Sequence, residues 1–147
     1  MDQIVKFQDR LIELMEDRHM KSVDLAKMLG VSKHAIKRWR HSDRFGLKIH
    51  NILNLCDIFN CSIEFITGRS NDVINYTPKP CPPFYERLRA LMADKNITRY
   101  KIVRDNVILD GYFTNWKRGR VPRLSCLIAI ADYMGCTLDY LLGRDDE

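Results

Sequence analysis

The chain lacks long apolar segments, and this absence excludes several classes of protein. None of the apolar runs among its 147 residues approaches the roughly 20 residues that a helix needs to cross a bilayer. The first ten residues, MDQIVKFQDR, carry charges at Asp2, Lys6, Asp9 and Arg10 and contain no apolar core of signal-peptide length. We therefore expect a soluble, cytoplasmic protein with no membrane partner.

Motifs for catalysis and metal binding are also missing. The sequence has no HExxH, no glycine-rich phosphate-binding loop and no cysteine–histidine pair at a useful spacing. Its 5 cysteines form no CxxC pair, so we expect free thiols, buried where the context is apolar and helical (Cys56, Cys61, Cys126 and Cys136) and exposed at Cys81 between prolines. The sequence thus predicts no enzyme, no metal, no cofactor and no evident small-molecule ligand.

What the sequence does contain is one unit written twice. Trp39 and Trp116 occupy equivalent places in the two copies. The copies align at an offset of 77 residues upstream of these tryptophans and 75 residues downstream, so only a two-residue deletion just after Trp116 separates them. Such a repeat predicts two copies of one fold rather than a single larger domain.

The repeat and the prolines together predict the domain boundaries. We assign residues 1–69 to a first domain, 70–83 to a linker that holds four of the 5 prolines, and 84–147 to a second domain. Apolar residues recur every three or four positions in both domains, and nothing has the pattern of a strand. We expect an all-α fold of two tandem five-helix domains.

In the first unit the expected helices cover residues 5–17, a second segment between Ser22 and Gly30, a third segment after residue 32, 47–59 and 62–67. Ser22 is a candidate N-cap for the second helix, Gly30 ends it, and Ser32 caps the third. The third helix turns Ile36 and Trp39 inward, which leaves an outer face made of Lys33, His34, Lys37 and Arg38. Two short helices across a glycine turn, with a basic outer face, indicate a helix-turn-helix.

Basic residues gather at equivalent points of the repeat. The net charge is only +5, but residues 33–48 hold one acid, Asp43, against many basic residues, and residues 117–123 hold no acid. A single run of charged residues is most often just a solvent-exposed surface with no binding role. Two basic clusters at matching places favour binding to a polyanion.

At this point the chain resembles the family of the phage lambda repressor and Cro, the XRE-type helix-turn-helix domains. The resemblance rests on LAKMLGVSKHAIKRW in the first unit, and on TNWKRGRVPRL followed by LIAIADYMGCTLDYLLG in the second. It implies a regulator of transcription that binds double-stranded DNA, most simply a repressor. The alternative from another class is a protein-interaction or dimerisation module, such as an antitoxin-like partner-binding protein.

The resemblance also implies roles for particular residues. Ser22 matches a backbone-contacting position, Lys33, His34 and Lys37 match base-facing positions with Arg38 alongside, and Arg40 and Arg44 match the phosphate-contacting region. The candidates in the second unit are Arg99, Thr114, Asn115, Lys117, Arg118 and Arg120.

The second unit departs from the family pattern at its turn. Val107 stands where Gly30 stands in the first unit, and Leu109 replaces the cap at Ser32. We expect Asp105-Asn106 to supply the turn, because asparagine tolerates the left-handed region, and Asp110 to cap a helix that starts one residue later. Lys33 and His34 become Asp110 and Gly111, so base recognition by this unit and a role in packing or dimerisation are both left open.

The linker allows two arrangements on DNA. About 13 residues of partly polyproline geometry could span about 40 Å, and successive major grooves on one face of a duplex lie about 34 Å apart. One chain could therefore place both units on an asymmetric site. The alternative is a homodimer through the second unit, with a first unit on each half of a palindrome.

Overall fold

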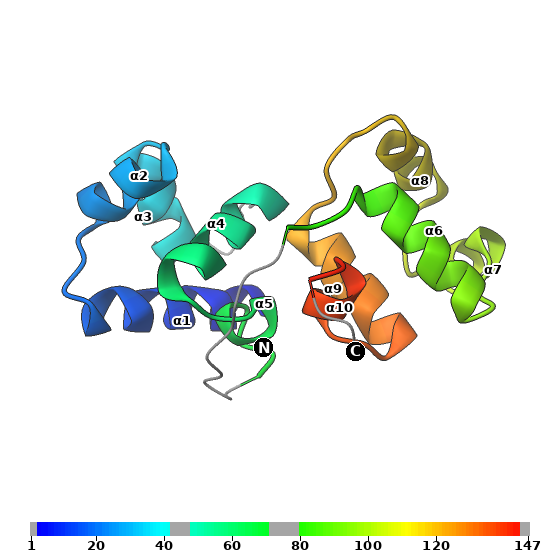
Figure 1. Ribbon diagram of the computed structural model, residues 1–147, viewed down its shortest axis with the longest axis horizontal. Helices are drawn as coiled ribbons and strands as arrows, with labels where there is room; N and C mark the ends of the chain where they lie inside the picture. Colours follow the sequence, from blue (N-terminus) through cyan, green and yellow to red (C-terminus); the bar gives the residue numbers. More distant parts are fainter. Residues whose placement is uncertain (1–2, 42–47, 71–79, 145–147) are drawn as a thin grey trace. The chain divides into compact units, whose positions relative to one another are not determined.

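The computed structural model describes residues 3–41, 48–70 and 80–144, with residues 3–6 described only in their backbone (Figure 1). The chain divides into two compact units, residues 1–78 and 79–147. Within the described ranges every regular element is a helix, which confirms the expected all-α fold of tandem domains. The boundaries 1–69, 70–83 and 84–147 stay a prediction.

The first unit contains five helices among its described residues, α1 to α5. They are α1 (Gln3–Asp17), α2 (Ser22–Leu29), α3 (Lys33–His41), α4 (Ile49–Phe59) and α5 (Ile63–Ile66). The second unit contains the equivalent series, α6 (Phe84–Asp94), α7 (Arg99–Arg104), α8 (Asp110–Lys117), α9 (Leu124–Met134) and α10 (Leu138–Leu141). The apolar periodicity therefore located the four helices of the first unit whose two ends it predicted to within about two residues.

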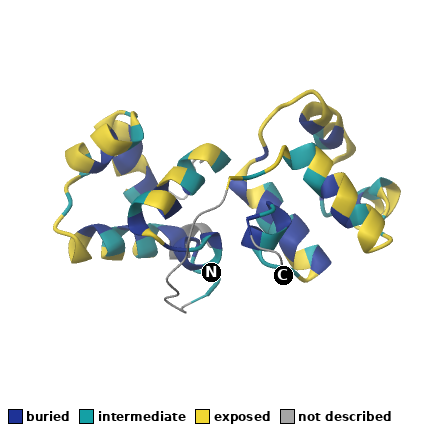
Figure 2. Cartoon of the chain, viewed as in Figure 1, coloured by how far each residue is buried: buried dark blue, intermediate teal, exposed yellow. Residues whose placement is uncertain are grey.

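Each unit has its own core, formed by the inward faces of its helices (Figure 2). Equivalent positions fill both cores, because Ile36 and Trp39 of α3 are buried just as Phe113 and Trp116 of α8 are. The two tryptophans are only 5% and 4% exposed. Their predicted role in core packing is confirmed.

The first and fifth helices of each unit are joined by equivalent arginines. The Arg10 guanidinium lies 3.8 Å from the ring centre of Phe65, and that of Arg87 lies 4.8 Å from the ring centre of Tyr140. Arg87 also donates a hydrogen bond of 2.7 Å to the carbonyl oxygen of Tyr140. The two units therefore share side-chain contacts between helices as well as sequence.

The helix ends agree with the sequence in most places. Ser32 accepts from the Ala35 amide at 3.2 Å, and Ser62 accepts from the Phe65 amide at 3.0 Å, as their cap positions predict. Gly30 has φ 70° at the end of α2, and Asn106 has φ 59° in the turn of the second unit. Both turns thus use the left-handed conformation at a residue that tolerates it.

Two predicted caps are wrong. Ser22 is the first residue of α2 rather than its N-cap, which is Lys21, and the Lys21 amide donates to the Asp24 carboxylate at 3.0 Å. Asp110 is likewise the first residue of α8, whose N-cap is Leu109 and has no side-chain cap hydrogen bond. In both cases the helix begins one residue earlier than expected. The Ser22 hydroxyl accepts a hydrogen bond from Arg40 instead, and the Asp110 carboxylate accepts one from Arg99.

The cysteine predictions hold in part. Cys56 and Cys61 are buried free thiols, as expected. Cys126 and Cys136 are only half-buried, and so is Cys81, which was expected to be exposed. For Cys126 the difference arises because α9 turns this side chain toward a surface hollow rather than into the core.

Gly30 and Gly111 should respond in opposite ways to alanine. A methyl group meets no atom within 4 Å at either site, but Gly30 has φ 70° and Gly111 lies inside α8 with no positive φ. We expect Gly30→Ala to lower the free energy of unfolding by about 1–2 kcal/mol through backbone strain. Gly111→Ala should raise it by roughly 0.5–1 kcal/mol. Urea denaturation of both variants checks this, and equal effects would contradict it.

Candidate nucleic-acid interface

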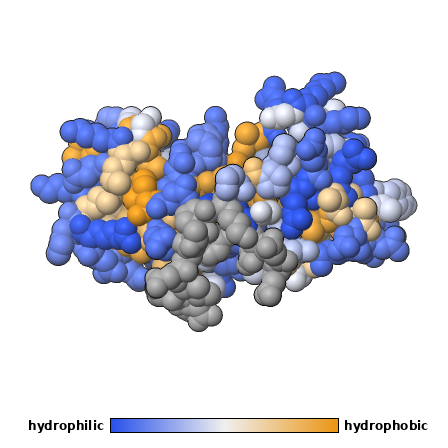
Figure 3. All heavy atoms as spheres, viewed as in Figure 1, coloured by the Kyte–Doolittle hydropathy of each residue, from blue (hydrophilic) through white to orange (hydrophobic). Residues whose placement is uncertain are grey.

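The outer face of α3 is the most basic helical surface that the described part of the first unit presents. Ala35, Ile36 and Trp39 are buried against the rest of the unit. The opposite face is therefore solvent-exposed, and it carries Lys33, His34, Lys37 and Arg38. The structure thus places these four predicted residues together on one accessible face. Hydrophilic residues cover most of the visible surface of each unit (Figure 3).

Ser22 and Arg40, two further candidates, contact each other. The Arg40 guanidinium donates to the Ser22 hydroxyl at 3.0 Å, which joins the end of α3 to the start of α2. Both residues are half-buried. Sequence reasoning missed this contact, because the two residues are 18 positions apart. Arg44 lies outside the described residues.

In the second unit an aromatic cluster holds α8 in place. Trp116 packs edge-on against Phe84 and Phe113, with ring centres 5.2 and 5.4 Å apart, and stacks with Tyr112 at 6.1 Å. Phe113 and Trp116 occupy the buried side of the helix. The exposed side carries Thr114, Asn115 and Lys117, and Arg118 and Arg120 follow in the exposed loop.

Arg99 makes a network on the outer face of α8 that the sequence did not predict. Its Nε donates to Oδ1 of Asp110 at 2.7 Å, and one terminal nitrogen donates to the Asp110 carbonyl at 2.9 Å and to the Thr114 hydroxyl at 3.2 Å. The pair is solvent-exposed, so it stabilises the fold little. Its effect is local: the carboxylate of Asp110 is neutralised by Arg99. The available signal was the opposite charges on the first residues of two consecutive helices.

The two units therefore present different chemistry at equivalent positions. Lys33 and Lys37 of the first unit correspond to Asp110 and Thr114 of the second. The lysines are free to donate outward, whereas Asp110 and Thr114 accept hydrogen bonds from Arg99. The first unit is thus the more strongly basic of the two at its third helix.

No metal site appears among the residues that the structure describes, since His, Cys, Asp and Glu side chains form no suitable cluster there. Across the same ranges, none of the helices has the length and hydropathy to cross a membrane.

Two short helices that meet at a tight turn, the second with an exposed polar face, define a helix-turn-helix protein. A family model for the Cro/C1-type HTH DNA-binding domain matches residues 10–69 and again residues 87–147. Comparisons with curated proteins and with solved structures give no match. The two family matches together cover most of the chain, so the protein belongs to the Cro/C1-type HTH family and carries two of its domains in tandem. Membership in this family supports the interpretation of the protein as a DNA-binding regulator, and proteins of this family are typically non-enzymatic.

Proposed function

We propose that the protein is a sequence-specific regulator of transcription that binds double-stranded DNA and represses by occupying a site near a promoter. The observation that carries this proposal is the outer face of α3, where Lys33, His34, Lys37 and Arg38 are exposed while the inward face holds the unit's core. Family membership supports DNA binding, and this face supports base recognition by the first unit.

The chemistry of that face suits the major groove. Lysine donates to O6 and N7 of guanine, and a histidine side chain can donate or accept at a base edge. The N-terminal end of α3 also adds a favourable potential for phosphate oxygens. We assign Lys33, His34 and Lys37 to base contacts, and Ser22, Arg38 and Arg40 to the positioning of the helix on the backbone.

The second unit is less suited to base recognition at its third helix. Arg99 neutralises the Asp110 carboxylate and also bonds to Thr114, so neither side chain is free for a base, and Gly111 offers no side chain. Lys117, Arg118 and Arg120 are exposed and free of acidic neighbours in sequence, so we assign them to phosphate contacts. The second unit thus contributes affinity more than sequence discrimination.

Affinity for duplex DNA should fall steeply with salt. Each neutralised phosphate contributes a slope of about −0.9 in log K against log salt, so roughly five contacts give a slope near −4 or −5. Fluorescence anisotropy at a series of salt concentrations measures it, with Lys117→Ala expected to reduce the slope by about one. A flat salt dependence would instead favour the interaction-module alternative.

Sequence specificity is tested by selection of bound sequences from a random duplex pool with the full chain. Enrichment of one site supports the proposal, and guanines in that site are expected where Lys33 and Lys37 contact the groove. Recovery of the pool without enrichment, despite salt-sensitive binding, would show a non-specific DNA-binding protein and would overturn the assignment of base contacts.

A further inference from the structure

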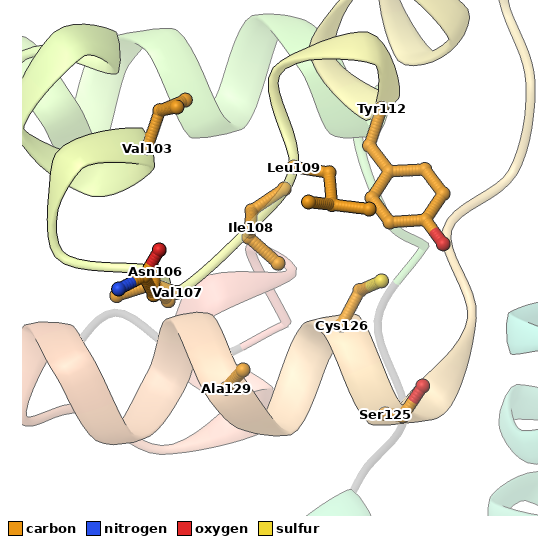
Figure 4. A pocket seen from close by; sticks show the side chains of 9 residues that line it. All are labelled: Val103, Asn106, Val107, Ile108, Leu109, Tyr112, Ser125, Cys126 and Ala129. Atoms are coloured by element: carbon orange, nitrogen blue, oxygen red, sulfur yellow. The ribbon is translucent and has the colours of Figure 1, made fainter.

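The surface of the second unit holds an apolar hollow beside the turn between α7 and α8. Its volume is about 420 Å³, and its walls include Val107, Leu109, Tyr112, Cys126 and Ala129. Figure 4 shows Leu109 and Tyr112 reaching toward the face of α9 that carries Cys126. Leu109 is nevertheless 71% exposed, so the apolar hollow has an uncovered leucine at its edge.

A second hollow adjoins the first and is lined by arginine. It measures about 160 Å³, and Arg120, Arg123 and the half-exposed Val121 form part of its wall. We call it the arginine hollow. Tyr112 and Cys126 line both hollows, so the two form one continuous surface.

The two arginines give this surface an uncompensated positive charge. The nearby acids already have partners, because Asp110 pairs with Arg99 at 2.7 Å and Asp105 pairs with Arg104 at 3.1 Å. The residues that line the two hollows include no acid. Within the described part of the chain, neither arginine of the arginine hollow forms an ion pair. An acidic ligand would therefore complement the surface.

The repeat shows that the fold does not require an apolar surface here. Both units adopt the same series of helices around cores at matching positions. The first unit has smaller or more polar residues where the second has the walls of the apolar hollow: Gly30, Ser32, Ala35, Asn51 and Asn54 stand at the positions of Val107, Leu109, Tyr112, Cys126 and Ala129. An uncovered apolar surface that the fold does not need indicates a binding site.

The shape of the surface suits a segment of protein. Asn106, Leu109 and Ser125 line the apolar hollow and are exposed, so the hollow is open to solvent along one side. A small-molecule site encloses most of its ligand, whereas a protein segment needs to bury only one face against a groove. A DNA backbone would meet the two arginines but would leave the apolar hollow without a partner, because sugars and phosphates are polar.

We propose that this surface binds a single segment of a partner protein, one that carries apolar side chains next to Asp or Glu residues. Leu109 and the apolar hollow pack against the apolar side chains, and Arg120 and Arg123 donate hydrogen bonds to the carboxylates. Asn115 and Arg120 line the arginine hollow and are also candidates for DNA contact. The bound segment therefore competes with DNA for the second unit, a consequence that rests on the proposed function.

Selection from a phage-displayed library of random short peptides tests the proposal, with the full chain immobilised and no DNA present. Enriched peptides should combine Leu, Ile or Phe with Asp or Glu. A fluorescein-labelled synthetic copy of the most enriched peptide then gives a dissociation constant by fluorescence anisotropy. Leu109→Ser should raise this constant about tenfold or more, and Arg120→Ala/Arg123→Ala should raise it roughly threefold to tenfold. Leu109→Ser should fold, because it installs the residue of the first unit, where Ser32 caps its helix.

Two variants away from the surface are matched controls. Tyr100→Ser removes a large side chain of α7 that is 73% exposed, and Arg89→Ala/Lys95→Ala removes two exposed positive charges. None of these residues lines either hollow, so both variants should bind the peptide as the wild type does. Circular dichroism verifies that each variant keeps its helices.

Three results of the selection would overturn the proposal: no enriched peptide, enriched peptides without acidic residues, or an affinity that survives Leu109→Ser. Weaker duplex binding by Leu109→Ser, without any peptide binding by the wild type, would make this surface a DNA contact and would overturn it as well. Because peptide binding is measured without DNA, this proposal and the DNA-binding proposal fail separately.

Discussion

Replacing Trp39 by alanine should lower the free energy of unfolding of the first unit by roughly 3–5 kcal/mol, the usual cost of truncating a buried tryptophan. Trp39 is 5% exposed on the inward face of α3. Domains of this size have only a few kcal/mol of stability, so the change should unfold the first unit at room temperature. Trp116→Ala should do the same to the second unit, where it also removes three aromatic contacts.

The distribution of tryptophan makes the measurement specific to each unit. The chain has 2 tryptophans, one in each unit, so in each variant the fluorescence of the remaining one reports only on the intact unit. Urea titration should show that unit unfolding near its wild-type midpoint, while circular dichroism shows the loss of helix from the other. Trp39→Phe is the control and should cost less. Unchanged unfolding together with lost DNA affinity would identify the tryptophans as contact residues instead.

The double variant Lys33→Ala/Lys37→Ala should lose affinity for the selected site by about 30-fold or more. Each good base contact contributes roughly 1–3 kcal/mol, and 2 kcal/mol corresponds to about 30-fold. Both lysines are exposed, so their removal should leave the melting curve unchanged. Competition between the selected duplex and a scrambled one measures the effect, and most of the loss should fall on the selected duplex.

The repeat offers a control for this experiment at equivalent positions. Asp110→Ala/Thr114→Ala changes the corresponding residues of α8 and frees Arg99 from its hydrogen bonds. If the first unit makes the base contacts, this variant should discriminate between the two duplexes as the wild type does. A comparable loss of discrimination would show that both units recognise bases, and wild-type binding by the lysine variant would refute the assignment to α3.

The sequence predicted those features of the fold that depend on helical periodicity. Trp39 shares a helical phase with Ile36, and Trp116 with Phe113, so their burial followed from spacing alone. The turns at Gly30 and Asn106 were predictable because few residues tolerate a positive φ. The repeat made each of these predictions twice, which is why the family resemblance could be stated from segments of both units.

Features that depend on side chains reaching between helices were not predictable. The contact of Arg40 with Ser22 depends on how α2 and α3 cross, and periodicity does not report that crossing. The same holds for Arg99, which reaches Asp110 from the preceding helix. Its guanidinium binds the carboxylate that was expected to cap α8. The exposure of Leu109 was unpredictable for another reason: leucine has the hydropathy of a core residue, and only the structure shows that this one is exposed.

The separation of core and outer face within α3 and α8 also bears on how such a chain can diversify. Substitutions on the exposed side of one helix do not touch its buried side, and residues more than about 7–10 Å apart usually act independently. A duplicated gene can therefore alter one copy of the helix while the other keeps its ancestral partner. The two copies differ in this way at the aspartate, glycine and threonine of α8 and at the leucine before it, while Phe113 and Trp116 are buried like their counterparts in α3. Duplication thus gives one protein two surfaces that natural selection can tune separately.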